Sequence, residues 1–208
     1  MTPENRKLLT DGIKRLDISV PETVLEKLGH YLDSLMKWNR AFNLTAIREE
    51  KEMVIKHLLD SLAALPWLTG KSVIDVGTGA GLPGMVLAIV RPETQVTLLD
   101  SNSKKTRFLL QMVGELQLTN VKVVHSRVEE YREQTYDTVT SRAFASLADM
   151  LHWCAHLQGE AGRFAAMKGR YPTEEIAELP AGFKVVDVPK MTVPFLDDER
   201  HMVLIEKN

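Results

Sequence analysis

The chain has 208 residues, 44% of them hydrophobic, and a net charge of −2, which suits one α/β domain with a modest extension. This charge lacks the positive excess of a protein that coats nucleic acid, so an RNA substrate would need a local basic patch. Cys154 is the only cysteine, which excludes an intramolecular disulfide and a cysteine metal cluster. Without a membrane-length apolar run or a signal-peptide core, we expect a cytoplasmic protein with no membrane contact.

Residues 1–66 are predicted to form a helical region without strands. Apolar side chains recur at helical spacing in residues 1–16, 24–36 and 54–65. The stretch from Ser19 to Glu22 matches a capping box before the second helix. We expect this region to pack on a main domain that comprises residues 67–208.

The main domain is predicted to alternate strands and helices before it ends in a hairpin. Strands are predicted at residues 72–76, 95–100, 121–124, 136–140 and 162–168, and again at 183–193 and 202–205. Ser103 is predicted to cap the helix after the second strand. The order predicts an α/β, Rossmann-like fold with a mainly parallel seven-stranded sheet and an antiparallel C-terminal hairpin.

A glycine-rich loop follows the first predicted strand, in the stretch Asp75-Val-Gly-Thr-Gly-Ala-Gly-Leu-Pro-Gly84. Glycine lets the backbone turn tightly and approach a ligand closely, which applies first to Gly77 and Gly79. Helical spacing then runs from Leu82 until Arg91-Pro92. A strand, glycine loop and helix in this order are typical of a domain that binds an adenosine-containing ligand.

Two acids indicate which ligand this is. Asp100 ends the second strand about 20 residues past the loop, where an acceptor for ribose hydroxyls is expected. Asp75 would face a pyrophosphate in a dinucleotide site, whereas the sulfonium and amino groups of S-adenosylmethionine (SAM) tolerate an acid. We therefore favour SAM over NAD; the alternative for Asp75 is a purely local capping role.

Further candidates come from the carboxyl ends of the strands, where open α/β sheets bind ligands. Val128 and Glu129 are expected beside the adenine, and Arg142 on the reacting side, where it is our candidate for positioning. An exposed charge at a strand end is the alternative for Asp100, Glu129 and Arg142. Candidate RNA-binding residues are basic and lie near the same edge: Lys104, Lys105, Arg127, Lys168 and Arg170.

No side chain stands out as a general base, nucleophile or metal ligand. The six histidines lack the spacing of a metal site, and no nucleophile elbow is present. His57 and Cys154 lie on apolar helix faces, so we expect both to be packed. The sequence therefore predicts no certain catalytic residue and no metal.

Several motifs together resemble the bacterial 16S rRNA guanine-N7 methyltransferases, also called the glucose-inhibited division protein B family. The resemblance spans nearly the whole chain, and Ala80 departs from it, since relatives often have proline there. The motifs are Lys37-Trp-Asn-Arg-Ala-Phe-Asn-Leu-Thr45, His57-Leu-Leu-Asp-Ser61, Ile74 to Gly84, Leu98-Leu-Asp-Ser101, Ser126-Arg-Val-Glu-Glu130, Ser141-Arg-Ala-Phe-Ala-Ser146 and Glu199-Arg-His201.

The resemblance implies methyl transfer from SAM to N7 of the guanosine at nucleotide 527, in the 530 loop of 16S rRNA. It implies SAM contacts at Gly77, Leu82, Val128, Glu129 and Arg142. Guanine N7 carries a free lone pair that is not used in Watson–Crick pairing, so direct in-line attack needs no general base. We expect a monomer whose partner is 16S rRNA, as naked RNA, an assembly intermediate or the small ribosomal subunit.

Aromatic side chains could stack on an unpaired base of such a substrate. Phe144, Trp38 and Phe42 are the candidates, although aromatic residues are more often part of a core. Two alternative functions remain open at this point: a methyltransferase for a non-RNA acceptor, and a non-catalytic SAM-responsive protein of ribosome assembly. An NAD-dependent dehydrogenase is a more distant alternative.

Overall fold

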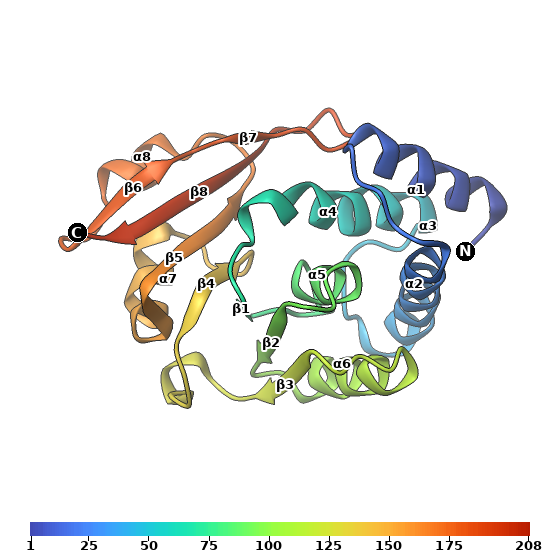
Figure 1. The fold of residues 1–208 in the computed structure, drawn as a ribbon, viewed down its shortest axis with the longest axis horizontal. Coiled ribbons are helices and arrows are strands. Elements are labelled where there is room, and N and C mark those ends of the chain that lie inside the picture. Colours follow the sequence, from blue (N-terminus) through green and yellow to red (C-terminus); the bar gives the residue numbers. More distant parts are fainter.

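The computed structural model describes all residues, 1–208, and contains one mixed sheet with helices on both faces (Figure 1). The strand order is β3-β2-β1-β4-β5-β8-β6, with β7 paired to β8. The strands are β1 Ser72–Val76, β2 Gln95–Asp100, β3 Val121–His125, β4 Tyr136–Ser141, β5 Gln158–Lys168, β6 Phe183–Asp187, β7 Lys190–Met191 and β8 Arg200–Lys207.

The first five strands are parallel, and β8 runs antiparallel to β5, β6 and β7. This confirms the predicted α/β fold with its antiparallel C-terminal end. The sheet has eight strands rather than seven, because the segment predicted as one strand at 183–193 is divided into β6 and the two-residue β7. β8 lies between β5 and β6 in the sheet. Its residues Met202–Ile205 are therefore buried in the middle of the C-terminal half of the sheet.

The helices fall into a large N-terminal group and a small group on the opposite face. The α-helices are α1 Pro3–Arg15, α2 Glu22–Phe42, α3 Glu50–Met53, α4 Asp60–Ala64, α5 Gly84–Val90, α6 Ser103–Glu115, α7 Leu147–Cys154 and α8 Thr173–Ala177. A π-helical segment, Val54–Leu59, joins α3 to α4, and short 3₁₀ turns span Leu65–Trp67, Val128–Glu130 and Ala155–Leu157. None of the helices is long and apolar enough to cross a membrane.

Two sequence predictions about helix caps were wrong. Ser19 does not cap α2, which begins after Pro21 without any side-chain cap; Pro21 keeps Val20 out of the helical region of backbone space. Asn102, rather than Ser103, caps α6 by accepting the N–H groups of Lys104 and Lys105. The α-helix α4 ends at Ala64, and Pro66 lies in the 3₁₀ turn that follows it.

Residues 1–66 share one core with the sheet. The larger of two hydrophobic clusters joins Leu9, Leu32 and Leu58 of the helical region to Val86 and Leu109 of α5 and α6. The smaller cluster lies on the other face of the sheet and includes buried residues of α7, with Ile176 of α8 packed against it; Figure 1 shows these two helices apart from the N-terminal group. The helical region therefore packs on α5 and α6, which themselves lie against one face of the sheet.

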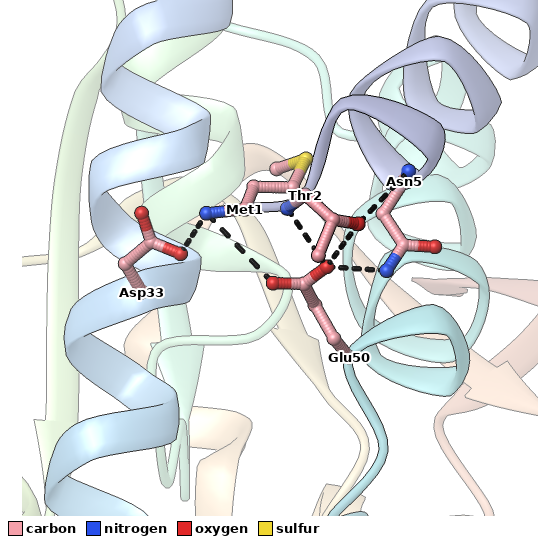
Figure 2. A network of polar contacts seen from close by, with 5 residues as sticks. All are labelled: Met1, Thr2, Asn5, Asp33 and Glu50. Atoms are coloured by element: carbon pink, nitrogen blue, oxygen red, sulfur yellow. Dashed lines mark hydrogen bonds and ion pairs between the residues drawn. The ribbon is translucent and has the colours of Figure 1, made fainter.

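The first residues of the chain are tied to α2 and α3 (Figure 2). The Met1 amino group pairs with Asp33 of α2 and lies 3.7 Å from the Glu50 carboxylate of α3. Glu50 also accepts hydrogen bonds from the Thr2 N–H, at 3.0 Å, and from the Asn5 side chain. These contacts fix the start of α1 against the other helices.

Candidate active site

A cavity of about 580 Å³ lies at the carboxyl ends of β1, β2 and β3, within the size range of small-molecule sites. Gly77 and Asp100 lie on the side of the glycine loop, and Val128 and Glu129 lie past the end of β3. Phe144, which follows β4, provides an aromatic wall. The cavity therefore lies where the sheet topology predicted a ligand, and four of the predicted cofactor residues line it.

The glycine loop brings its backbone close to neighbouring segments. Gly77 has φ +65° and Gly79 has φ +59°, a region that favours glycine. A Cβ on Gly77 would lie 2.6 Å from Ala143 Cβ, so no side chain fits between the loop and the segment after β4. Glycine at position 77 is thus required by conformation and by space.

Asp100 connects the loop to the start of α6. Its Oδ2 accepts the Gly79 N–H at 2.8 Å, and its Oδ1 accepts the Asn102 N–H at 2.9 Å. The residue is mostly buried but lines the cavity. This carboxylate is held by main-chain donors in a fixed orientation, as an acceptor for ligand hydroxyls requires.

Asp75 lies behind the loop and not on the wall of the cavity. It is fully buried, and its Oδ2 accepts hydrogen bonds from the Thr78 hydroxyl and the Gly84 N–H, both at 2.8 Å. Burial raises the pKa of Asp75 to about 7, against the lowering effect of Thr78 and Gly84. The geometry matches the local capping role, at the start of α5, that the sequence left open.

Of the other predicted cofactor residues, some line the cavity and others do not. Gly79 and Leu82 do not line the cavity: Gly79 donates to Asp100, and Leu82 is buried in the larger core cluster. Arg142 also lies outside the cavity, where its side chain pairs with Asp60 of α4. Gly77, Asp100, Val128 and Glu129 are the predicted residues that line it.

A second group of polar side chains lies where α4 meets β4 and β8, and we call Asp60, Arg142 and Arg200 the arginine cluster. Arg142 Nη1 lies 3.6 Å from Asp60 Oδ2, and Arg200 Nε lies 3.2 Å from Asp60 Oδ1. Burial raises the pKa of Asp60, while the two guanidinium groups oppose that rise. The arginine cluster thus joins the helical region to two strands.

His57 lies near this cluster and is buried, as predicted. Its Nε2 is 2.8 Å from the Thr45 hydroxyl oxygen. Burial and the nearby Arg142 charge lower the pKa of His57 to about 4, so the imidazole is neutral at physiological pH. Cys154 is also buried as predicted, and burial raises the pKa of its thiol to about 12, which rules out a reactive thiolate.

The candidate RNA-binding residues differ in how they are paired. Lys168 Nζ is 2.8 Å from a Glu175 carboxylate oxygen, and Arg127 Nη1 is 3.7 Å from one of Glu129. The other three make none of the ion pairs in the structure. Lys104 lies near the exposed Phe42 ring, Lys105 reaches toward Gly79, and Arg170 lines a separate open cavity beside Arg200.

Sequence reasoning missed Asp60, Arg200 and Tyr31. The Tyr31 hydroxyl, from α2, donates to the Ala80 carbonyl of the glycine loop at 2.6 Å. Asp60 and Arg200 stand inside motifs that carried the family resemblance, but their distance along the chain gives no sign that they meet. No group of three or more His, Cys, Asp or Glu side chains is arranged to hold a metal ion.

Comparison with solved structures defines the class of fold. Magnesium protoporphyrin IX methyltransferase from Synechocystis PCC 6803, solved with bound SAM, matches with a TM-score of 0.60 at 14% identity, over 91% of this chain and 99% of its own. A SAM-dependent methyltransferase from Aquifex aeolicus matches with a TM-score of 0.55 at 20% identity, over 74% and 92%. The fold is that of the SAM-dependent methyltransferases.

Sequence comparison is more specific. The family model for rRNA small subunit methyltransferase G matches residues 24–203. The curated ribosomal RNA small subunit methyltransferase G of Cronobacter sakazakii is 52% identical over 201 residues, which are 96% of this chain and 97% of the relative. That of Escherichia coli K12 is 52% identical over 197 residues, or 94% and 95%. The chain belongs to the rRNA small subunit methyltransferase G family.

Proposed function

We propose that the protein transfers a methyl group from SAM to N7 of a guanosine in 16S rRNA, at nucleotide 527 of the 530 loop. The observation that carries the proposal is a cavity lined by Asp100 and Phe144, beside the arginine cluster, at one edge of a methyltransferase sheet. Family membership supports rRNA of the small subunit as the acceptor. We further propose that the protein acts as a monomer in the cytoplasm, with residues 1–66 as a helical region on domain 67–208.

The cavity fits SAM in size and chemistry. Bound SAM supplies an electrophilic methyl group on a positively charged sulfur. Asp100, which lines the cavity and is held by the Gly79 and Asn102 N–H groups, would accept hydrogen bonds from the ribose hydroxyls. Val128 and Glu129 would hold the adenine, Gly77 would let the backbone approach the cofactor, and Arg142, outside the cavity, would lie on the reacting side.

The side chains position the reactants and move no proton. Guanine N7 is a free acceptor on the base edge, so a nearby base is not required. The buried His57 and Cys154 are neutral, and Asp75 is sealed behind the glycine loop. Proximity and orientation can supply several kcal/mol of the barrier on their own, on the order of 7 or more in the best intramolecular cases.

The test is transfer of a radiolabelled methyl group from SAM to unmodified small ribosomal subunits and to their extracted RNA. Strand cleavage directed at N7-methylguanosine then locates the label. We expect one labelled guanosine in the 530 loop, and no label in subunits that already carry the modification. SAM binding without transfer to either substrate would instead support the non-catalytic assembly protein, and transfer only to another molecule would support a non-RNA acceptor.

A further inference from the structure

Asp60, Arg142 and Arg200 come from three segments that are far apart in the sequence. Asp60 is the first residue of α4, Arg142 follows β4, and Arg200 begins β8. The Asp60 side chain is 2% exposed, whereas those of Arg142 and Arg200 are 32% and 22% exposed. The carboxylate is therefore inside the protein, and the two guanidinium groups reach toward solvent.

A buried carboxylate is costly unless cations pair with it, and two adjacent arginines repel each other without such an anion. Each Asp60 oxygen serves one arginine, at 3.6 Å and 3.2 Å. Asp60 also follows directly on the π-helical segment, and its N–H bonds back to the carbonyl of Ile55. Single turns of π-helix occur often at functional sites, and this one sets where the carboxylate lies.

Both arginines keep donors that the protein does not use. Arg142 contacts Asp60 through Nη1, and Arg200 uses Nε for Asp60 and Nη1 for the Glu199 carbonyl, at 2.9 Å. Arg200 Nη2 and the remaining nitrogens of Arg142 make no hydrogen bond within the protein. Lys168, also near this sheet edge, differs because Glu175 occupies its ammonium group.

The surroundings of Arg200 leave room for a ligand. An open cavity of about 670 Å³ is lined by Arg200, Arg170, Gly169, Asp198 and Glu199. The two carboxylates repel an anion, so net charge alone does not attract one here. Anion binding at this edge would depend instead on the guanidinium groups of Arg200, which lines this cavity, and of Arg142, which shares Asp60 with it; a guanidinium fork recognises phosphate and carboxylate groups in a bidentate manner.

We propose that Asp60 is a positioning residue that holds Arg142 and Arg200 together as one oxyanion-binding site beside the cofactor cavity. The proposal rests on the proposed methyl transfer and names a site for it. The oxyanion is a phosphate group of the RNA or the carboxylate of the methionine portion of SAM. Both present two oxygens to a guanidinium fork, and the experiment below separates them.

The test compares Asp60→Asn with wild type in methyl transfer to small subunits and in SAM binding by calorimetry. The asparagine keeps the size of the side chain but loses the charge that aligns the arginines. If the oxyanion is an RNA phosphate, the KM for subunits rises about tenfold, equivalent to about 1.4 kcal/mol, while the Kd for SAM is unchanged. If it is the SAM carboxylate, the Kd for SAM rises by a similar factor.

A double-mutant cycle with Arg200→Gln distinguishes positioning from general damage. Because Asp60 also pairs with Arg142, Asp60→Asn is expected to have a smaller, but not vanishing, effect once Arg200 is glutamine. Arg200→Lys, which keeps the charge but loses the fork, is expected to resemble Arg200→Gln. If Asp60→Asn does not fold, Arg200→Lys and Arg200→Gln still test whether the guanidinium fork is needed. Glu133→Gln is the matched control, because Glu133 pairs with Lys122 on the exposed surface.

Either of two results would overturn the inference: a folded Asp60→Asn protein with unchanged KM and unchanged SAM affinity, or full additivity with Arg200→Gln. A lower melting temperature without either kinetic change would assign Asp60 to stability alone. These outcomes are separate from failure of the proposed function, since in that case the wild-type protein itself would transfer no methyl group to subunits.

Discussion

The cofactor cavity and the arginine cluster lie at the same edge of the sheet but are built in different ways. The cavity is lined by residues at or after the ends of four successive strands, between Val76 and Phe144, and Asp100 in its wall is held by two N–H groups. The arginine cluster is made of charged side chains from three separate segments. The cavity therefore depends on the successive strands of the parallel half of the sheet, whereas the arginine cluster depends on contacts between the helical region and the later strands.

The largest expected effect concerns the buried acid behind the glycine loop, and Asp75→Asn tests it. The folded-state pKa is raised from 3.8 to about 7, so the folded protein binds more protons than the unfolded chain between these values. Wild-type stability therefore falls as pH rises from 3.8 through 7, by up to about 4 kcal/mol. Asp75→Asn, which retains an acceptor for Thr78 and Gly84, should lack this fall in urea unfolding.

The same variant also tests the comparison itself. If Asp75 only caps α5 and the cavity is shaped by backbone, the Kd for SAM of Asp75→Asn at pH 6 stays within about twofold of wild type. A loss of tenfold or more in a stably folded variant would show that Asp75 reaches the cofactor, and would make the cofactor side dependent on a buried charge as well.

On the side of the arginine cluster, His57 gives a pH dependence of the opposite sign. Its folded-state pKa is lowered from 6.5 to about 4, so the unfolded chain binds more protons in this range. Stability is therefore lost as pH falls from 6.5 to 4, by up to about 3 kcal/mol. We expect His57→Gln to flatten that slope, and the exposed His152→Gln to leave it unchanged. An unaltered slope in His57→Gln would assign the acid sensitivity to other groups.

A smaller effect is expected for Asp100→Ala, which removes the carboxylate from the cavity wall. Loss of its hydrogen bonds to the ribose and to Gly79 should weaken SAM binding by about 2 kcal/mol, or about 30-fold. Asp137→Asn is the control, because Asp137 accepts two N–H groups, from Lys71 and Ser72, at the amino end of β1. Equal SAM affinity in wild type and Asp100→Ala would mean that the cofactor lies elsewhere.

The smallest expected effect is on stability, and it distinguishes a steric clash from backbone strain in the glycine loop. Gly77→Ala and Gly79→Ala both place a Cβ on a backbone with positive φ, at a cost of about 1 kcal/mol each. Only at Gly77 does the new Cβ meet a neighbour, Ala143, whereas the nearest atom at Gly79 is the end of the Lys105 side chain at 3.9 Å. Thermal unfolding should therefore show Gly77→Ala as the less stable variant, by about 1 kcal/mol or more.

The residues around the cavity were predicted from the sequence better than the arginine cluster, for a physical reason. The β1 strand, the loop and β2 follow local rules of strand pattern and glycine conformation, and β1 and β2 were predicted with the bounds that the structure has. The direction of a side chain at a strand end is not local. Arg142 pairs with Asp60, on a helix of the other region, and does not line the cavity.

The errors at helix ends have similar causes. A capping box at Ser19 satisfied a spacing rule, but the helix starts only after Pro21. The apolar spacing at residues 54–65 is compatible with α- and π-helix alike, so it could not reveal the π-helical segment that precedes Asp60. In both cases the pattern identified a helix and left its exact geometry to neighbouring groups.

The hydrogen bond from Tyr31 to Ala80 and the shared core have a consequence for how the protein denatures. Because α2 holds the glycine loop and packs on α5 and α6, which lie against the sheet, loosening the helices also releases the loop beside the cavity. Denaturant should therefore give one cooperative transition that far-UV circular dichroism and SAM binding report together. A fragment that begins at residue 67 would expose the apolar faces of α5 and α6 that the N-terminal helices cover, and it should precipitate rather than fold into a smaller methyltransferase.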